Sequence, residues 1–244
     1  MPKIQINNLS ISINEKKILN NINLEINKGD VIAIVGPNGN GKSTLLKSIM
    51  NHYSVEKEGG DILIDGVSTN EMEPNEIMKN GIFFAPQNSE EIPGVLMIDF
   101  LKAIVNANRD TPIKMAELFK NIEAILKDLN LDRSILKRFV NHGFSGGEKK
   151  KSEILQMKLL NPECILLDEI DSGLDVDSIK LVINELKKIV DGEKSLIIVS
   201  HQQKIFDVIK PNKVIVIMGG KIIKEGDYSL LEKINNEGYE WLNF

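Results

Sequence analysis

A glycine-rich segment early in the chain has the residue types and spacing of a phosphate-binding loop. Residues 36–43 read GPNGNGKS, and they follow the apolar run Val31–Val35. Glycine adopts backbone angles that other residues avoid, so successive N–H groups of such a loop can turn inward toward an anion. The helix expected from about Ser43 directs the positive end of its dipole at the same point. A plain glycine-rich turn is the alternative, but it leaves the grouping of Lys42, Ser43 and Thr44 unexplained.

The side chains that end this segment indicate which anion it takes. A lysine in this position reaches the β- and γ-phosphates of a nucleoside triphosphate, and the hydroxyl that follows it binds Mg²⁺. We therefore expect a nucleoside triphosphate site in which Ser43 is a Mg²⁺ ligand. The predicted nucleotide-binding residues of this segment are Gly36, Pro37, Asn38, Gly39, Asn40, Gly41, Lys42, Ser43 and Thr44.

A second apolar run ends in two carboxylates, because residues 165–169 read ILLDE. A buried strand delivers its last residues to the carboxyl edge of the sheet, where ligands bind in open α/β folds. We predict that Asp168 holds Mg²⁺, directly or through water. Glu169 then faces the γ-phosphate and orients or deprotonates the attacking water. A solvated acidic turn after a strand is the alternative.

A third segment, residues 144–148, reads FSGGE and precedes a helix expected from about Lys149. A serine before two glycines at a helix N-terminus is a second anion site. In isolation, a helix cap followed by a glycine turn explains it equally well. A single bound phosphate does not need both this anion site and the glycine-rich loop of the same chain. We therefore predict a dimer in which each chain offers Ser145, Gly146 and Gly147 to nucleotide held by the other.

Three single polar residues stand at the ends of predicted elements. His201 follows the apolar strand at 196–200, where its imidazole can hydrogen-bond a γ-phosphate. Gln87 follows the strand Ile82–Ala85 and can contact Mg²⁺ and the attacking water. Asp175 follows the carboxylates closely enough to lie at the same edge and shape a dimer interface. Alone, each is ordinary: a structural histidine, a loop glutamine and a helix cap.

Strands and helices alternate along the chain in a way that places these segments at one edge of a sheet. Such alternation implies an α/β fold, with a mostly parallel sheet and flanking helices. We expect one domain over 1–244, with a catalytic core at 1–88 and 161–244 and a helical subdomain at 89–160. Polar residues 56–60 suggest a loop. The predicted strands are Ile4–Ile13, 22–26, Val31–Val35, 62–64, Ile82–Ala85, 164–167, 196–199 and 214–218, and the clearest helices are 115–129 and 177–190.

The bulk composition excludes several classes of protein. The 244 residues are 42% hydrophobic and 27% charged, which argues against disorder, and the net charge of −5 argues against a dedicated nucleic-acid binder. Cys164 is the single cysteine and lies in an apolar strand, so we expect a buried packing residue. No apolar run approaches the roughly 20 residues that cross a bilayer. We expect a cytoplasmic location without direct membrane insertion.

Taken together, these segments resemble the ATP-binding cassette (ABC) family over essentially the whole chain. The resemblance implies an ABC ATPase fold of the P-loop NTPase class, with a mixed or parallel central sheet, N-terminal antiparallel strands and an inserted helical subdomain. It also implies a head-to-tail dimer that sandwiches two ATP molecules with Mg²⁺, closing on ATP and opening after hydrolysis. The matches are Walker A at 36–43, the Q-loop at Gln87, the signature at 145–148, Walker B at 164–169, the D-loop at 172–175 and the switch histidine at His201.

One position departs from the family pattern. Cassettes usually stack adenine on an N-terminal aromatic residue, but no aromatic residue precedes Tyr53 here, and Ile13 stands in that place. The resemblance then implies that apolar contact replaces stacking, with weaker base affinity and looser base selectivity.

Finer features resemble the SufC subfamily, the ATPase of iron–sulfur cluster assembly. They are Ile170-Asp171 and Val176-Asp177 in place of prolines, the helix 148–157, the segment 91–95 and the tail 238–241. This resemblance implies SufB- and SufD-like scaffold proteins as partners, through the Q-loop and the helical block. Residues 85–88 depart from the more aromatic SufC pattern, so the geometry of partner docking can differ.

Three other functions stay open. They are an energy-coupling subunit of a membrane transporter, a regulatory or nucleic-acid-linked cassette, and a degenerate cassette that binds ATP without hydrolysing it. Glu169 and His201 argue against the last. Lys149, Lys150 and Lys151 either steer phosphate or form a solvated helix face.

Overall fold

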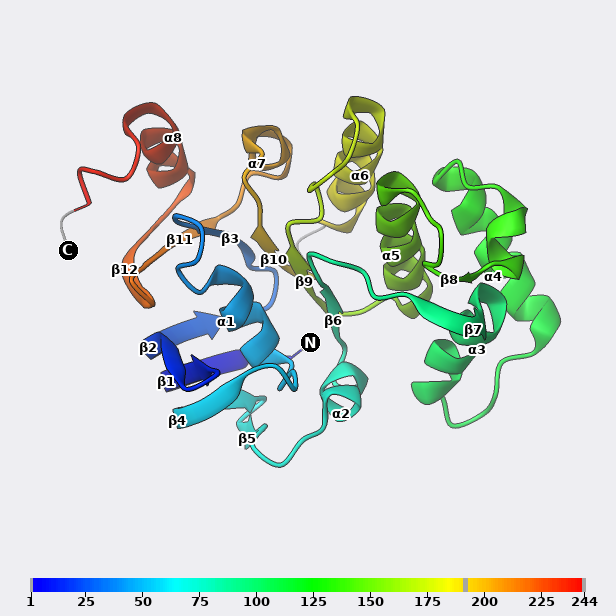
Figure 1. The fold of residues 1–244 in the computed structure, drawn as a ribbon, viewed down its shortest axis with the longest axis horizontal. Coiled ribbons are helices and arrows are strands. Elements are labelled where there is room, and N and C mark those ends of the chain that lie inside the picture. The colour runs from blue at the N-terminus through cyan, green and yellow to red at the C-terminus, as the bar shows by residue number, and fades with distance from the viewer. Residues whose placement is uncertain (1, 191–192, 243–244) are drawn as a thin grey trace. The chain divides into compact units, whose positions relative to one another are not determined.

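The structure, a computed structural model, describes residues 2–190 and 193–242. Its contacts divide the chain into two compact units (Figure 1). The core unit comprises Met1–Gln87, Glu163–Ile170 and Leu186–Phe244, and the helical unit comprises Asn88–Pro162 and Asp171–Glu185. The sequence-based division assigned all of 161–244 to the catalytic core, whereas contacts group residues 171–185 with the helical unit. The functional division of the domain stays a prediction.

A six-stranded sheet of order β12-β11-β3-β10-β9-β6 forms the centre of the core unit. All neighbouring pairs are parallel except β11 and β12. Every residue of β3, β9 and β10 is buried, as expected of parallel strands covered on both faces. The mostly parallel sheet predicted from the sequence is therefore confirmed. The strands are β3 (Val31–Val35), β6 (Ile82–Ala85), β9 (Cys164–Asp168), β10 (Ser195–Val199), β11 (Lys213–Met218) and β12 (Lys221–Gly226).

The parallel arrangement places the carboxyl ends of four strands at one edge of this sheet. The glycine-rich segment follows β3, Gln87 follows β6, Glu169 follows β9 and His201 follows β10. The register keeps these ends level, because Val199 pairs with Asp168 and also with Ile34. The topology thus brings together residues that lie far apart in the sequence.

A second, antiparallel sheet in the core unit has the order β2-β1-β4-β5. The predicted loop at 56–60 is wrong, since these residues form the first half of β4 and Lys57 pairs with Ile11 of β1. Their polar composition hid the strand, because a solvent-facing edge tolerates charges that a buried strand excludes. The strands are β1 (Ile4–Ile13), β2 (Lys16–Ile26), β4 (Glu56–Ile64) and β5 (Val67–Ser68).

Helices of the core unit pack apolar side chains on these sheets. Helix α1 begins at Lys42, directly after the glycine-rich segment, and buries Leu45, Leu46 and Ile49 completely. These side chains belong to a core that both sheets share. The helices are α1 (Lys42–Ile49), α2 (Pro74–Lys79), α7 (Gln203–Ile209) and α8 (Tyr228–Glu237), and α6 (Val176–Ile189) has residues in both units.

The helical unit contains a small sheet that the sequence did not predict. The predicted helix at 115–129 is present as α4, and its apolar residues Leu118, Ile122 and Leu126 are buried. Strands β7 and β8 pair antiparallel through Ile92 and Val140. Strand β8 has only two residues, and β7 contains Pro93 and Gly94, which disfavour a strand, so only their non-local pairing reveals them. The elements are β7 (Ile92–Leu96), α3 (Met97–Ala107), α4 (Met115–Asp128), a 3₁₀ helix (Arg133–Lys137), β8 (Phe139–Val140) and α5 (Gly146–Leu160).

Membrane-spanning segments were sought throughout the described ranges. None of the helices there combines the length and the apolar character needed to cross a bilayer.

Candidate functional site

Two glycines fix the path of the segment 36–43. Gly36 has φ +145°, and a Cβ there would lie 2.0 Å from the Ile217 carbonyl oxygen of β11. Gly41 has φ +101°, and its Cβ would lie 2.5 Å from Cδ2 of Leu19. Backbone conformation disfavours a side chain at both positions, and at Gly36 the backbone carbonyl also leaves no space for one. The segment is therefore a tightly seated turn between β3 and α1.

The Asn40 side chain stabilises the same turn by hydrogen bonds within the loop and by one to a neighbouring turn. Its Nδ2 donates to the Pro37 and Asn38 carbonyl oxygens, both at 3.1 Å. Its Oδ1 accepts from the Gly219 N–H at 2.7 Å. Gly219 belongs to the turn between β11 and β12, which sequence reasoning missed as part of the site because nothing local connects it with the loop.

Lys42 lies over the loop that precedes it. Its Nζ donates to the carbonyl oxygens of Gly36 at 2.8 Å and Pro37 at 3.1 Å, and the residue is almost fully buried. Burial lowers the pKa of Lys42, while the charges of Glu169 and Asp168 oppose that shift. A lysine ammonium held at the backbone of a glycine-rich loop is the feature expected for binding phosphate oxygens.

Ser43 and Asp168 place two oxygen donors together. The Ser43 hydroxyl donates to Oδ1 of Asp168 at 2.9 Å, and Asp168 is 1% exposed. Hydroxyl and carboxylate oxygens are ligands that Mg²⁺ prefers, and few protein ligands suffice when phosphates supply the rest. Within residues 2–190 and 193–242, no group of three His, Cys, Asp or Glu side chains has the arrangement of a metal site. The pair fits Mg²⁺ bound together with a nucleotide.

Glu169 is held on both sides by the two other predicted catalytic residues. The Gln87 Nε2 donates to Oε2 of Glu169 at 2.6 Å, and the His201 Nε2 lies 3.4 Å from Oε1. The Glu169 backbone has φ +48°, and its N–H donates to the Val199 carbonyl at 2.9 Å. The carboxylate is 18% exposed, so it stays accessible to water. Gln87, predicted as a Mg²⁺ ligand, thus contacts Glu169 through its amide nitrogen.

A cavity of about 470 Å³ brings most of these side chains together. Its wall joins the glycine-rich loop and the start of α1 to the strand ends that carry Gln87, Glu169 and His201. Ile13, the residue in the place of the usual aromatic, lines it together with Ile18. Apolar, cationic and hydroxyl groups in one wall suit a ligand with a base and a chain of phosphates. The other lining residues are Asn38, Gly39, Gly41, Lys42, Ser43 and Thr44.

In the helical unit, Ser145 is the N-cap of the 15-residue helix α5. Its Oγ accepts from the Glu148 N–H at 3.2 Å, and Oε2 of Glu148 accepts from the Ser145 N–H at 2.8 Å. This is a capping box, so the cap that the sequence left as an alternative is present. The first N–H groups of the helix proper, at Gly146 and Gly147, have no partner within the helix and are available to an anion.

The two glycines of this segment pack against the loop that starts α6. A Cβ on Gly146 would lie 3.2 Å from the Gly173 carbonyl oxygen, and one on Gly147 would lie 3.1 Å from Oγ of Ser178. Asp175 caps α6, because its Oδ1 accepts from the Ser178 N–H at 2.8 Å. That bond lowers the pKa of Asp175. Residues 145–147 and Asp175 therefore lie together in the helical unit.

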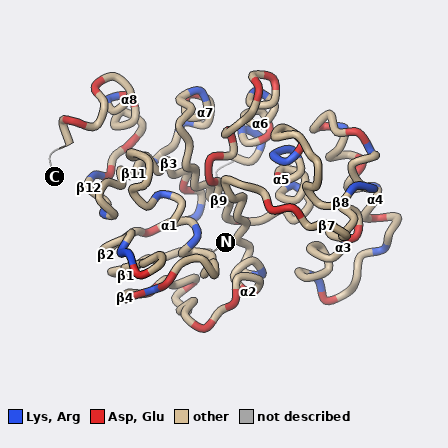
Figure 2. Tube along the Cα trace, in the orientation of Figure 1, with Lys and Arg blue, Asp and Glu red and all other residues tan. Residues whose placement is uncertain are grey.

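The lysine run at the start of α5, seen in Figure 2, is not uniform. Lys149 forms an ion pair with Glu91 at 2.8 Å, whereas Lys150 is 5% exposed and pairs with the equally buried Glu153 at 3.1 Å. The interpretation as a solvated helix face is therefore wrong for Lys150.

Cys164 is buried, and burial raises the pKa of its thiol to about 12. Its predicted role as a packing residue is confirmed.

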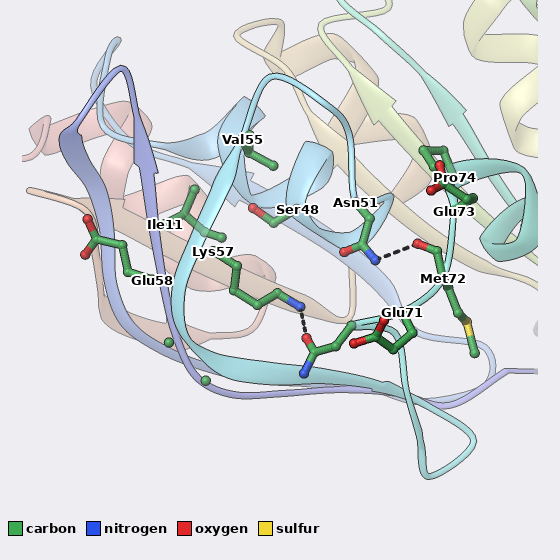
Figure 3. Close-up of a pocket in the computed structure, with 13 residues that line it drawn as sticks. Ile11, Ser48, Asn51, Val55, Lys57, Glu58, Glu71, Met72, Glu73 and Pro74 are labelled. Atoms are coloured by element: carbon green, nitrogen blue, oxygen red, sulfur yellow. Dashed lines mark hydrogen bonds between the residues drawn. The ribbon is translucent and has the colours of Figure 1, made fainter.

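A second cavity of the core unit, of about 620 Å³, lies elsewhere (Figure 3). Ser48 and Asn51 line it at the end of α1, and none of the predicted site residues does. The Lys57 Nζ donates to the Asn70 side chain at 2.6 Å, and the Asn51 Nδ2 donates to the Met72 carbonyl at 3.0 Å. These two pairs of lining groups are bonded to one another, and the cavity has no part in the candidate site.

Comparisons with known proteins agree with this geometry. The family model described as "ABC transporter" matches residues 19–172. The chain is 43% identical to the "Probable ATP-dependent transporter ycf16" of Trieres chinensis over 99% of this chain and 98% of that protein. It is 39% identical to "Vegetative protein 296" of Bacillus subtilis (strain 168), over 98% and 92%. A dimeric ATP-binding cassette bound to ADP and Pi has a similar fold, with a TM-score of 0.79 and 24% identity over 92% of this chain and 98% of that one. The chain therefore belongs to the ABC transporter family and is an ATP-hydrolysing ABC cassette.

Proposed function

We propose that the core unit binds MgATP in the 470 Å³ cavity and hydrolyses it by in-line attack of water. Lys42 contacts the β- and γ-phosphates, and its pairing with two loop carbonyls holds the cation where those oxygens arrive. Ser43 and Asp168 hold Mg²⁺, which when bound neutralises charge on the phosphate oxygens. Ile13 provides apolar contact for the base in place of aromatic stacking.

The proposal for the chemical step rests on the position of the Glu169 carboxylate. The carboxylate accepts the proton of the attacking water, or orients that water, as a general base does. Gln87 and His201 fix its two oxygens and so fix the direction of attack. The φ of +48° and the bond from its N–H to the Val199 carbonyl hold the backbone from which the carboxylate projects. His201 also approaches the γ-phosphate and distinguishes ATP from ADP.

We further propose that a second copy of the chain completes each site in a head-to-tail dimer. Ser145, Gly146 and Gly147 of one copy meet the γ-phosphate held by the other, and the free N–H groups of α5 supply the contact. Asp175, packed beside this segment, shapes the same interface. Binding of ATP by both copies favours the closed dimer, and hydrolysis removes that preference. The dimeric cassette bound to ADP and Pi supports this arrangement.

We propose that closing and opening of the dimer rearranges a SufB–SufD-type scaffold for iron–sulfur cluster assembly. The support is the group of SufC-like segments at 91–95, 170–171 and 238–241. The first of them forms β7, where Ile92 and Val95 are each 37% exposed, and Phe139 of the neighbouring β8 is 41% exposed. Apolar side chains exposed together on a small sheet are suited to a protein partner.

A second candidate is the energy-coupling subunit of a membrane transporter. The printed names of relatives favour it, since they read "Probable ATP-dependent transporter ycf16" and "Probable ABC transporter ATP-binding protein". Both candidates share the hydrolytic site and differ in the partner that the helical unit contacts.

Native affinity purification of the chain, followed by identification of its stoichiometric partners, separates the two. Recovery of SufB- or SufD-like scaffolds is expected, and it should be lost in Val95→Glu. Val208→Glu is a matched control, because Val208 is 40% exposed on α7 of the core unit. Recovery of an integral membrane permease instead would replace the scaffold proposal with the transporter.

A further inference from the structure

One arginine of the helical unit, Arg138, makes three contacts around the predicted anion site at 145–147. Its Nη1 donates to Oε1 of Glu148 at 2.7 Å, and its Nη2 donates to the Gly143 carbonyl oxygen at 2.7 Å. Its guanidinium carbon lies over the Phe144 ring, 4.2 Å from the ring centre. A single planar group is thus bonded to residues on both sides of this segment.

The backbone of Arg138 and the ring beneath its guanidinium fix the position of this side chain. The Arg138 N–H donates to the Ile135 carbonyl at 3.2 Å, and the Arg138 carbonyl accepts from the Met97 N–H, at the start of α3, at 2.9 Å. Phe144 is buried among the apolar residues of the helical unit. Because a cation is attracted to the face of an aromatic ring, the buried ring holds the guanidinium in place.

The Glu148 side chain connects Arg138 with the N-cap of α5. Its Oε1 accepts from Arg138, and its Oε2 accepts from the Ser145 N–H at 2.8 Å. The bond from the Ser145 N–H lowers the pKa of Glu148, with a further part from Arg138, against the opposing effect of burial. Arg138 therefore fixes the side chain that closes the capping box, and with it the first turn of α5.

We propose that Arg138 is a positioning residue for ATP hydrolysis, which holds the segment 145–147 in the geometry that meets a γ-phosphate bound by a second copy of the chain. The inference rests on the composite site proposed above. Donors that are already in place need no reorganisation when charge develops on the phosphate. The position of these donors should therefore affect turnover, whereas ATP binding to the loop of the same chain should not depend on Arg138.

Replacement by lysine tests the proposal, because Arg138→Lys keeps the charge and removes the planar fork. A lysine ammonium cannot bond Glu148 and the Gly143 carbonyl while it also lies flat on the Phe144 ring. The loss of a hydrogen bond to a charged group should lower turnover at saturating ATP roughly 10-fold. The Kd for ATP of the single chain should stay that of the wild type.

Arg133→Lys is the matched control within the same unit. Arg133 also pairs with a glutamate, Glu123 at 3.1 Å, and also lies near an aromatic ring, 5.5 Å from the centre of Phe119. Both of these partners lie on α4, away from the segment 145–147. Turnover of Arg133→Lys should therefore equal that of the wild type.

Mixing of two variants shows whether Arg138 acts on the site of the other chain. An excess-free, equal mixture with the Lys42→Ala chain should raise the activity of each Arg138→Lys chain up to about fivefold, because half of these chains then sit opposite an intact segment 145–147. A general loss of structure in the Arg138→Lys chain would not be rescued in this way.

Four results would overturn the positioning role. They are wild-type turnover in Arg138→Lys, an equal fall in Arg133→Lys, a raised Kd for ATP that accounts for the fall, and no rescue on mixing. Ser145→Arg in the same assay separates the two proposals. If Ser145→Arg is inactive while Arg138→Lys behaves like the wild type, only the role of Arg138 fails. If Ser145→Arg turns over ATP like the wild type, the composite site is wrong and the inference fails with it.

Discussion

Replacement of Glu169 by glutamine isolates the chemical step from nucleotide binding. Glu169→Gln keeps the shape of the side chain and an oxygen that can accept from the Gln87 amide, now at 2.6 Å. It removes the negative charge and the basic lone pair. The backbone position should survive, because the N–H bond to Val199 does not involve the side chain. ATP binding is therefore expected to persist.

The expected loss follows from the role of a general base. Such a group contributes roughly 10²–10⁴-fold to a rate, which corresponds to about 2.7–5.5 kcal/mol in the activation barrier. The charge of Glu169 also opposes the lowering of the Lys42 pKa by burial. Removing that charge should not release the nucleotide, because the loop carbonyls still hold the lysine ammonium.

Steady-state ATPase assays together with equilibrium binding of a fluorescent ATP analogue measure both quantities. Glu225→Gln is the control, because Glu225 forms an exposed ion pair with Lys213 at 3.3 Å and lies outside the cavity. It should turn over ATP like the wild type, since exposed pairs contribute little. Turnover of Glu169→Gln within a few-fold of the wild type would refute the role of Glu169. Loss of binding in that variant would show that its charge supports the nucleotide and not the chemistry.

Two further perturbations test the loop and the helix cap. Gly36→Ala should destabilise the fold by about 3 kcal/mol or more, because its Cβ would meet the Ile217 carbonyl, whereas Gly39→Ala, at φ +76° with open space, should cost about 1–2 kcal/mol. Urea denaturation compares them, and equal costs would contradict the close approach. The Ser145 N–H lowers the pKa of Glu148 below 4.5, so this stabilisation is present above pH 4.5 and is lost as the pH falls through the folded value. As the pH falls below 4.5 the wild type should lose stability more steeply than Glu148→Gln, and parallel pH profiles would exclude the contribution.

The residues of the catalytic edge could be predicted because local sequence carries their signal. A fully apolar run followed by GPNGNGKS, or by two carboxylates, predicts a buried strand and also the phosphate- or metal-binding role of the residues at its end. Parallel pairing then brings those ends to one edge, as the register of Val199 with Asp168 shows. The place of Ile13 at the base site came from the resemblance to the ABC family, in which an aromatic residue usually stands there, and Ile13 does line the cavity.

The features that were missed depend on contacts between distant parts of the chain. The polar half of β4 is a strand because β1 pairs with it, and β7 is a strand because Val140 lies opposite Ile92. The brace of the phosphate-binding segment is likewise non-local, since Gly219 approaches it from the turn between β11 and β12. Its sequence signal is a glycine pair, which many proteins carry without such a role.

Complementation between two inactive variants tests the composite site most directly. Lys42→Ala disables the phosphate-binding segment, and Ser145→Arg blocks the anion site of α5. If each site takes its loop from one chain and Ser145 from the other, a mixed dimer has one intact site and one doubly defective site. Equal mixing should then restore up to about a quarter of wild-type ATPase activity, since half the dimers are mixed and half their sites are intact. A mixture as inactive as its components would contradict the account.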